Sequence, residues 1–260
     1  MRYCLILASL ATAVGTAPLR AQTLPRYQAA QLACVAYEVR VHTALNTQIQ
    51  GHPRAESLRR TGTLIVRGSE LDSAIAIEAW WDSLRLWRRA DDQTLEPDPE
   101  GVLGGRYRGR LERDGRFFRS AAPWIPDDVA EVSDLATALD DLFPPLPPSI
   151  LKRGERVSSL AGDLFIRLAD SSGRARYRIT SSSKTSQPPD SERNFAIGET
   201  ESSDGVLAWG NEGLLRWDRT VIAETEITEN PQRAFRSRVQ QRIEMRRVGN
   251  CGEDGKRVGR

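Results

Sequence analysis

The sequence predicts a mainly β protein with a curved antiparallel sheet or half-barrel and one amphipathic helix near residues 128–143. Two observations predict this class. Short segments that alternate apolar with polar residues, with turn residues between them, recur along most of the chain. Only one stretch, near the middle, has the three- and four-residue apolar spacing of a helix. We therefore expect strands on both sides of a single helix.

The first half of the chain contains six predicted strands. Residues 35–42 alternate valine or tyrosine with small or polar side chains, which is the period of two of a half-buried strand. Residues 68–69 and 82–83 have a composition typical of turns, and Asp114-Gly115 indicates a tight hairpin. The other predicted strands are residues 62–66, 74–81, 84–88, 105–111 and 115–119.

The predicted helix has an apolar stripe and a definite end. Asp127 or Asp128 would cap its N-terminus, where a negative charge also suits the helix dipole. The proline-rich residues 144–148 end the helix, because proline cannot continue it, and they form a stiff extended connector. The stripe consists of Val129, Val132, Leu135, Leu139 and Leu142.

Strands are predicted again after the connector. Residues 210–213 turn one hairpin. Residues 181–193 are polar and contain two adjacent prolines, so we expect a mobile loop there. Residues 252–260 are expected to form a disordered tail. The predicted strands of this half are residues 164–168, 175–181, 194–200, 205–209, 214–227 and 235–248.

Residues 22–251 are predicted to form a single β-rich domain, which is long enough to bury a core. Residues 34–120 and 160–250 form two halves of similar layout, joined by the helix and the proline-rich connector of residues 127–148. An ancient duplication would explain this similarity. Alternating strands and turns also resemble each other by default, so both interpretations stay open.

Residues 1–21 have the layout of a cleaved secretory signal. Arg2 provides a short cationic start, and residues 4–14 are an apolar run that is too short to span a bilayer. Ala21 places a small residue at the cleavage site, with cleavage after Gly15 as the alternative. We therefore expect an exported protein, periplasmic or extracellular, with no transmembrane anchor in the mature chain.

The charge balance argues against nucleic acid as a partner. The full chain has 37 Lys and Arg and 35 Asp and Glu. Loss of residues 1–21 removes Arg2 and Arg20 and no acidic residue, which leaves a formally neutral mature chain. Nucleic-acid binding needs a net or clustered positive field, whereas acidic residues are interleaved with the arginines here.

Two cysteines, Cys34 and Cys251, would remain in the mature chain, at the start of its first strand and the end of its last. An even number of cysteines in an oxidising compartment favours one disulfide between them. Two independent free thiols are the alternative.

The sequence carries no strong catalytic, metal or cofactor motif. Its two histidines, His42 and His52, have no neighbouring ligands at zinc spacing, and no Gly-x-Ser-x-Gly motif presents a nucleophilic serine. Ser149 and Lys152 match Ser-x-x-Lys, but the companion motifs occur in the wrong order. Pairs of adjacent acidic residues cannot supply the two carboxyl groups that a glycosidase holds on opposite sides of its cleft. We therefore expect no metal, no cofactor and no enzymatic activity.

Trp80 gives the one residue-level hypothesis for a binding site. Because strand neighbours face opposite sides, Trp81 shares the apolar face with two isoleucines, whereas Trp80 shares a mixed face with Ala76. Every second residue of 106–110 is arginine. These arginines form either an anion or lipid-headgroup stripe or a solvated face paired with acids across the strands. The hypothetical ligand-binding residues are Trp80, Ala76, Arg106 and Arg108.

The overall layout resembles that of uncharacterised exported bacterial β-rich proteins. More distantly, it resembles the periplasmic lipoprotein-carrier fold, in which an unclosed barrel covered by helices holds acyl chains. The resemblance covers most of residues 34–248 and rests on layout alone. The carrier fold has more helix than this chain offers, so no site residue is carried over from it.

This resemblance implies a non-catalytic secreted or periplasmic protein that binds an apolar ligand, a lipid or acyl chain, or a protein partner of the cell envelope. Two alternatives stay open. One is a structural or assembly module with no small-molecule ligand, and the other is a carboxylate-based hydrolase.

Overall fold

The computed structural model describes residues 24–49, 51–189, 194–230 and 233–251, most of which lie in strands. The predicted signal and the predicted tail fall outside the described residues. Within the described ranges, no helix is long and apolar enough to cross a membrane.

Strands dominate both halves of the chain. The described residues contain one 3-10 helix, η1 (Ala29–Leu32), and one α-helix, α1 (Asp127–Val132). The strands are β1 (Val35–Ile49), β2 (His52–Leu71), β3 (Ala74–Ala90), β4 (Gln93–Leu95), β5 (Tyr107–Leu111), β6 (Phe117–Ala121), β7 (Arg156–Ser158), β8 (Leu164–Arg167), β9 (Ala175–Gln187), β10 (Ala196–Gly210), β11 (Gly213–Asn230) and β12 (Arg233–Asn250).

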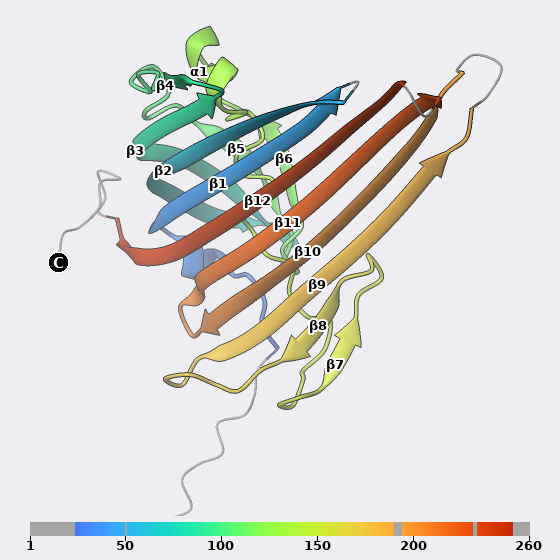
Figure 1. Cartoon of the computed structure of the whole chain (residues 1–260). Coiled ribbons are helices and arrows are strands. Elements are labelled where there is room, and N and C mark those ends of the chain that lie inside the picture. Colours follow the sequence, from blue (N-terminus) through green and yellow to red (C-terminus); the bar gives the residue numbers. More distant parts are fainter. Residues whose placement is uncertain (1–23, 50, 190–193, 231–232, 252–260) are drawn as a thin grey trace, which may run out of the picture.

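These twelve strands form one antiparallel sheet in the order β6-β5-β3-β2-β1-β12-β11-β10-β9-β8-β7, and β4 pairs with β3. The first long strand, β1, and the last, β12, therefore lie side by side in the middle of the sheet (Figure 1). The two ends of the order, β6 and β7, do not pair with each other. The prediction of a mainly β protein with a curved, unclosed antiparallel sheet is confirmed.

The strands are longer than the sequence predicts. The turns expected at residues 68–69 and 82–83 are wrong, because β2 and β3 continue through them. At residues 82–83 the β2–β3 register shifts by one residue, as in a β-bulge, and β3 continues past the shift. The loop expected at residues 181–193 is wrong in its first part, since β9 continues to Gln187. Polar residues stay in these strands because a neighbouring strand pairs with them and satisfies backbone hydrogen bonds.

The predicted helix near residues 128–143 is wrong in its length. α1 ends at Val132, and Ser133 has an extended backbone with φ −153° and ψ 132°. Asp134 then accepts hydrogen bonds from the backbone N (3.3 Å) and the Oγ1 (2.7 Å) of Thr137. Such a local side-chain bond competes with a continuing helix.

The apolar stripe predicted for that helix is nevertheless buried. After α1 the chain continues in short turns whose backbone bonds span three residues, and these turns keep the same side chains on the sheet. We call residues 127–143 the cover segment. Its stripe, which is 2% exposed or less, consists of Val129, Val132, Leu135, Leu139 and Leu142.

The core lies between the cover segment and one face of the sheet, which we call the inner face. In β1 the inner face carries Val35, Tyr37 and Val39, each at most 1% exposed. Glu38 and Arg40 alternate with them and lie on the opposite, outer face. The alternation that the sequence predicts for this strand is therefore confirmed.

Aromatic contacts connect the two halves across the core. Tyr27, in the segment before η1, packs edge-on against Phe143 of the cover segment and Trp209 of β10, with ring centroids 6.0 and 5.0 Å apart. Its hydroxyl donates to the backbone carbonyl of Pro144 at 3.3 Å. The N-terminal segment thus contributes to the single core that both halves share.

A disulfide joins Cys34 and Cys251, as the sequence predicts. The Cys251 backbone N also donates to the Cys34 carbonyl at 3.3 Å, directly beyond the β1–β12 ladder. Both cysteines pack against a small apolar cluster formed by Ala36, Ile65 and Trp80 on the outer face. The disulfide therefore closes the ladder that joins the two halves.

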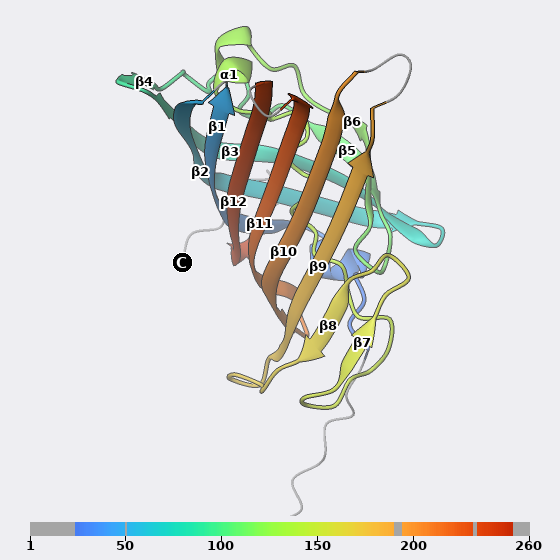
Figure 2. The same ribbon diagram turned by 45° about the vertical axis from the view of Figure 1, so that its right-hand side comes forward.

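The long strands continue past the cover segment. On the inner face of β1, Val41 is 7% exposed, Thr43 and Leu45 are half-buried, and Ile49 is 44% exposed. Figure 2 shows that β9 and β10 also continue well beyond the short strands β8 and β7. Among the described residues, the sheet thus has a covered part, which holds the core, and a distal part that no other segment covers.

Candidate functional site

Trp80 lies on the outer face of β3 and is only 6% exposed. It packs with Ala36 and Ile65. The Arg106 guanidinium stacks on its ring at 3.6 Å from the centroid, and the Arg67 guanidinium lies 5.6 Å from it. Cation–π contacts of this kind stabilise the cluster and cover the ring.

The other predicted site residues lie on the same face of the sheet. Arg108 pairs with Glu78 across the β3–β5 ladder at 3.3 Å, and Ala76 lies beside Arg110 in the same ladder. Arg110 in turn pairs with Glu112 at 3.0 Å. Two of the three arginines in the stripe, Arg108 and Arg110, are therefore solvated and paired with acids, as one of the two interpretations of the sequence expects, whereas Arg106 stacks on Trp80. A ligand role for Trp80, Ala76, Arg106 and Arg108 stays a prediction.

Metal ligands do not gather anywhere in the part of the chain that the structure describes. No group of three or more His, Cys, Asp or Glu side chains is close enough there to hold a metal ion.

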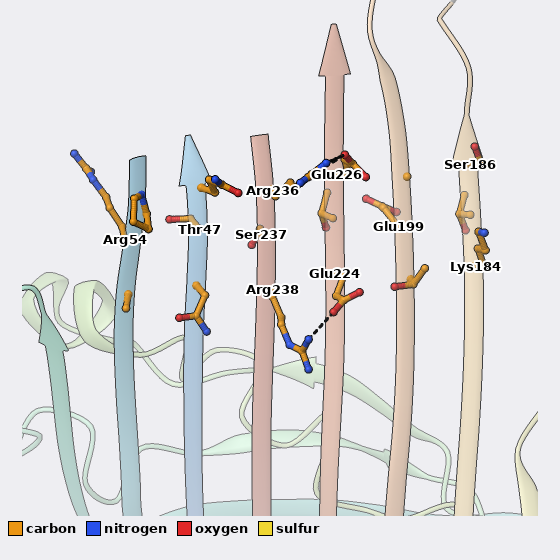
Figure 3. A pocket seen from close by; sticks show the side chains of 18 residues that line it. Thr47, Arg54, Lys184, Ser186, Glu199, Glu224, Glu226, Arg236, Ser237 and Arg238 are labelled. Carbon is orange, nitrogen blue, oxygen red and sulfur yellow. Dashed lines mark hydrogen bonds and ion pairs between the residues drawn. The ribbon is translucent and has the colours of Figure 1, made fainter. Parts of the chain in front are cut away.

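A groove of about 910 Å³ crosses the distal ends of six strands on the outer face (Figure 3). We call it the outer groove. Four of its charged side chains are paired, Arg236 with Glu226 at 2.8 Å and Arg238 with Glu224 at 3.0 Å, and both signs of charge are present. It therefore offers hydrogen bonds without a concentration of one charge. Two cross-strand rows line it: Ala55, Asn46, Arg238, Glu224, Thr200 and Lys184, and then Pro53, Gln48, Arg236, Glu226, Gly198 and Ser186.

Apolar side chains continue along the inner face beyond the cover segment. The ladder registers place Leu45 beside Val239, which lies beside Ala223, and they place Ile49 beside Phe235. Except for Ile49, these side chains are half-buried. We call the apolar residues of this region the inner distal surface: Leu45, Ile49, Leu58, Ile197, Val221, Ala223, Ile227, Phe235 and Val239.

A polar row crosses the inner distal surface. Thr47, Ser237 and Thr225 lie side by side between the row of Leu45 and the row of Ile49. These three residues carry hydroxyl groups, and the row ends in the charged Arg54 of β2 on one side and Glu199 of β10 on the other. The surface therefore suits a mainly apolar ligand that also tolerates hydroxyl contacts.

A cavity of about 280 Å³ lies where the cover segment meets the inner distal surface. We call it the cover cavity. Thr43, Leu58 and Gln241 line it and lie in the sheet row next to that of Leu45, so the cavity adjoins the inner distal surface. Its other lining residues are Val41, Arg59, Arg60 and Ile243 of the sheet and Ser133, Asp134, Thr137, Ala138, Asp141 and Leu142 of the cover segment.

Arg60 is the charged side chain buried in this cavity. It lies on the inner face of β2, beside Val41 of β1, and is 9% exposed. Its guanidinium lies 5.7 Å from the centroid of the Trp81 ring. Burial lowers the pKa of Arg60, because the charged form loses its hydration. Sequence reasoning missed this residue, although its alternation with Leu58 and Leu64 places it on the apolar side of the strand.

Comparisons with known proteins bear on the fold. No known family model and no curated protein matches the sequence. Among solved structures, the chain superposes with a TM-score of 0.51 on one described as "Lipid-protein interactions in lipovitellin". The fold resembles that of lipovitellin. The two are 9% identical, and the match covers 85% of this chain and 25% of that one, so it shows a similar fold alone. The likeness to exported bacterial proteins and to the lipoprotein carriers stays a prediction.

Proposed function

We propose that this protein binds the apolar chain of a lipid on the inner distal surface. The observation that carries the proposal is the continuation of apolar side chains from the core onto a part of the sheet that no other described segment covers. An exposed apolar area bordered by polar residues is typical of a binding site. The similarity in fold adds support, since the lipovitellin structure is one of lipid–protein interactions.

The energetics favour a ligand with a long apolar chain. Each methylene group removed from water contributes about 0.8 kcal/mol, so a chain of about ten groups contributes on the order of 8 kcal/mol if it is fully buried. Part of that gain offsets the freedom that the ligand loses on binding. Affinity should therefore rise with chain length.

The proposed role is binding without catalysis in an exported protein. The inner distal surface consists of aliphatic and aromatic side chains and carries no nucleophile or acid–base pair within its own residues. The disulfide between Cys34 and Cys251 supports export, because disulfides persist in oxidising compartments.

Replacement of Val239 by Asp should weaken binding of a fluorescent fatty-acid probe at least about tenfold, because a ligand there would bury an unpaired charge. Val239 is half-buried, so the variant should still fold. Titration of the probe's fluorescence measures the affinity. Gln240→Asp is the matched control, since Gln240 is the next residue and is exposed on the outer face, and it should leave binding unchanged.

Two outcomes would contradict this site. If Val239→Asp and Gln240→Asp weakened probe binding equally, the added negative charge would act from either face of the sheet, and the inner distal surface would not be the site. Loss of probe binding in Trp80→Ala, with Val239→Asp unaffected, would place the ligand on the outer face, as the sequence alone suggests. A parent protein that binds no probe would favour the assembly module.

A further inference from the structure

The Nε of the Arg60 guanidinium is buried without a hydrogen-bond acceptor. Within the described residues, no carboxylate forms an ion pair with the guanidinium. The Trp81 ring lies beside the guanidinium, with its centroid 5.7 Å from Cζ. An arginine so deeply buried is ordinarily paired or hydrogen-bonded, so this site lacks an acceptor for Nε.

Two further donors near Arg60 are buried without a partner. These are the indole Nε1 of Trp81 and the hydroxyl of Tyr107. Burial raises the pKa of Tyr107, while the neighbouring Trp81 and Arg60 act to lower it, which places all three side chains in one neighbourhood. Trp81 and Tyr107 interact with each other and do not line the cover cavity, so Arg60 is the buried donor that an anionic group in the cavity would meet.

The carboxylates at the rim of the cover cavity are already engaged. Asp141 accepts from Arg219 at 2.9 Å, and Asp134 accepts from Thr137 at 2.7 Å. Both acids are exposed, so water screens their effect on Arg60. They reduce the positive field at the cavity without supplying the missing hydrogen bonds.

We propose that Arg60 binds the anionic end of the ligand, a carboxylate or phosphate group, in the cover cavity while the apolar chain runs out over the inner distal surface. This inference rests on the proposed function and adds the class of ligand, a single-chain anionic lipid. The planar guanidinium fork suits two oxygens of one group. The cavity, of about 280 Å³, is sized for the polar end of such a ligand, and Thr43, Leu58 and Gln241 connect it to the apolar rows.

The test compares lauric acid with dodecan-1-ol, which has the same chain length and no charge, by calorimetric titration at one salt concentration and pH 7.4. The parent should bind the acid about ten- to one-hundredfold more tightly than the alcohol, as expected for hydrogen bonds to a charged group. Arg60→Gln should remove that preference by weakening the acid alone. Arg40→Gln, at an exposed arginine on the outer face of β1 that does not line the cover cavity, should keep the preference.

The outcomes separate this inference from the proposed function. Equal affinity of the parent for acid and alcohol would overturn the role of Arg60 and leave lipid binding intact, and this result needs no variant. Equal weakening of both ligands in Arg60→Gln would do the same. Binding of neither ligand would overturn both proposals. Binding of inorganic phosphate without either lipid would reject a lipid as the source of the anionic group.

Discussion

Replacement of both Cys34 and Cys251 by alanine should lower the free energy of unfolding by about 5 kcal/mol at most. The two residues are 217 positions apart in the chain, and closing so long a loop removes much conformational freedom from the unfolded state. In the native state the disulfide also holds the end of the β1–β12 ladder, which joins the two halves of the sheet. Its loss should therefore affect the whole fold.

Thermal unfolding of the oxidised parent and the double variant measures this effect, and a decrease of roughly 10–20 °C in the melting temperature is expected for a domain of this size. Peptide mapping without reductant should first identify the crosslinked pair in the parent. Two thiols that react with an alkylating agent in the native parent, or equal melting temperatures, would contradict the role given to this disulfide.

Trp81→Ala should destabilise the protein by about 3–5 kcal/mol. The Trp81 side chain is fully buried on the inner face and belongs to the main core, so its removal leaves a cavity among rigid neighbours. Trp80→Ala should cost less, because Trp80 packs in the small outer cluster and partly under Arg106. Denaturant unfolding of both variants measures the difference. A larger loss for Trp80→Ala would mean that the outer cluster, and not the inner face, holds the main core.

The sequence predicts the faces of the strands well where alternation is strong. In β3 the prediction that Trp81 faces the core and Trp80 the opposite side is confirmed. The pairing of Cys34 with Cys251 likewise follows from their positions, one before the first strand and one after the last. Both features depend on local periodicity or on the few cysteines available.

The features that the sequence does not predict depend on contacts between residues that are far apart in the chain. The apolar spacing of the cover segment is confirmed by its burial, but its helix stops early because Asp134 bonds to Thr137. The polar end of β9 is a strand because β10 pairs with it. Arg60 is buried only because the cover segment, far along the chain, packs above it. Composition and periodicity contain none of these long-range contacts.

The central claim is that this protein binds a single-chain lipid on the inner distal surface. Native mass spectrometry of the protein purified from its own cells tests it most directly, with a second spectrum after incubation with lauric acid. We predict a species heavier than the bare chain by the mass of one single-chain lipid, and loss of that mass after extraction with organic solvent. A bare chain in both spectra would contradict the claim.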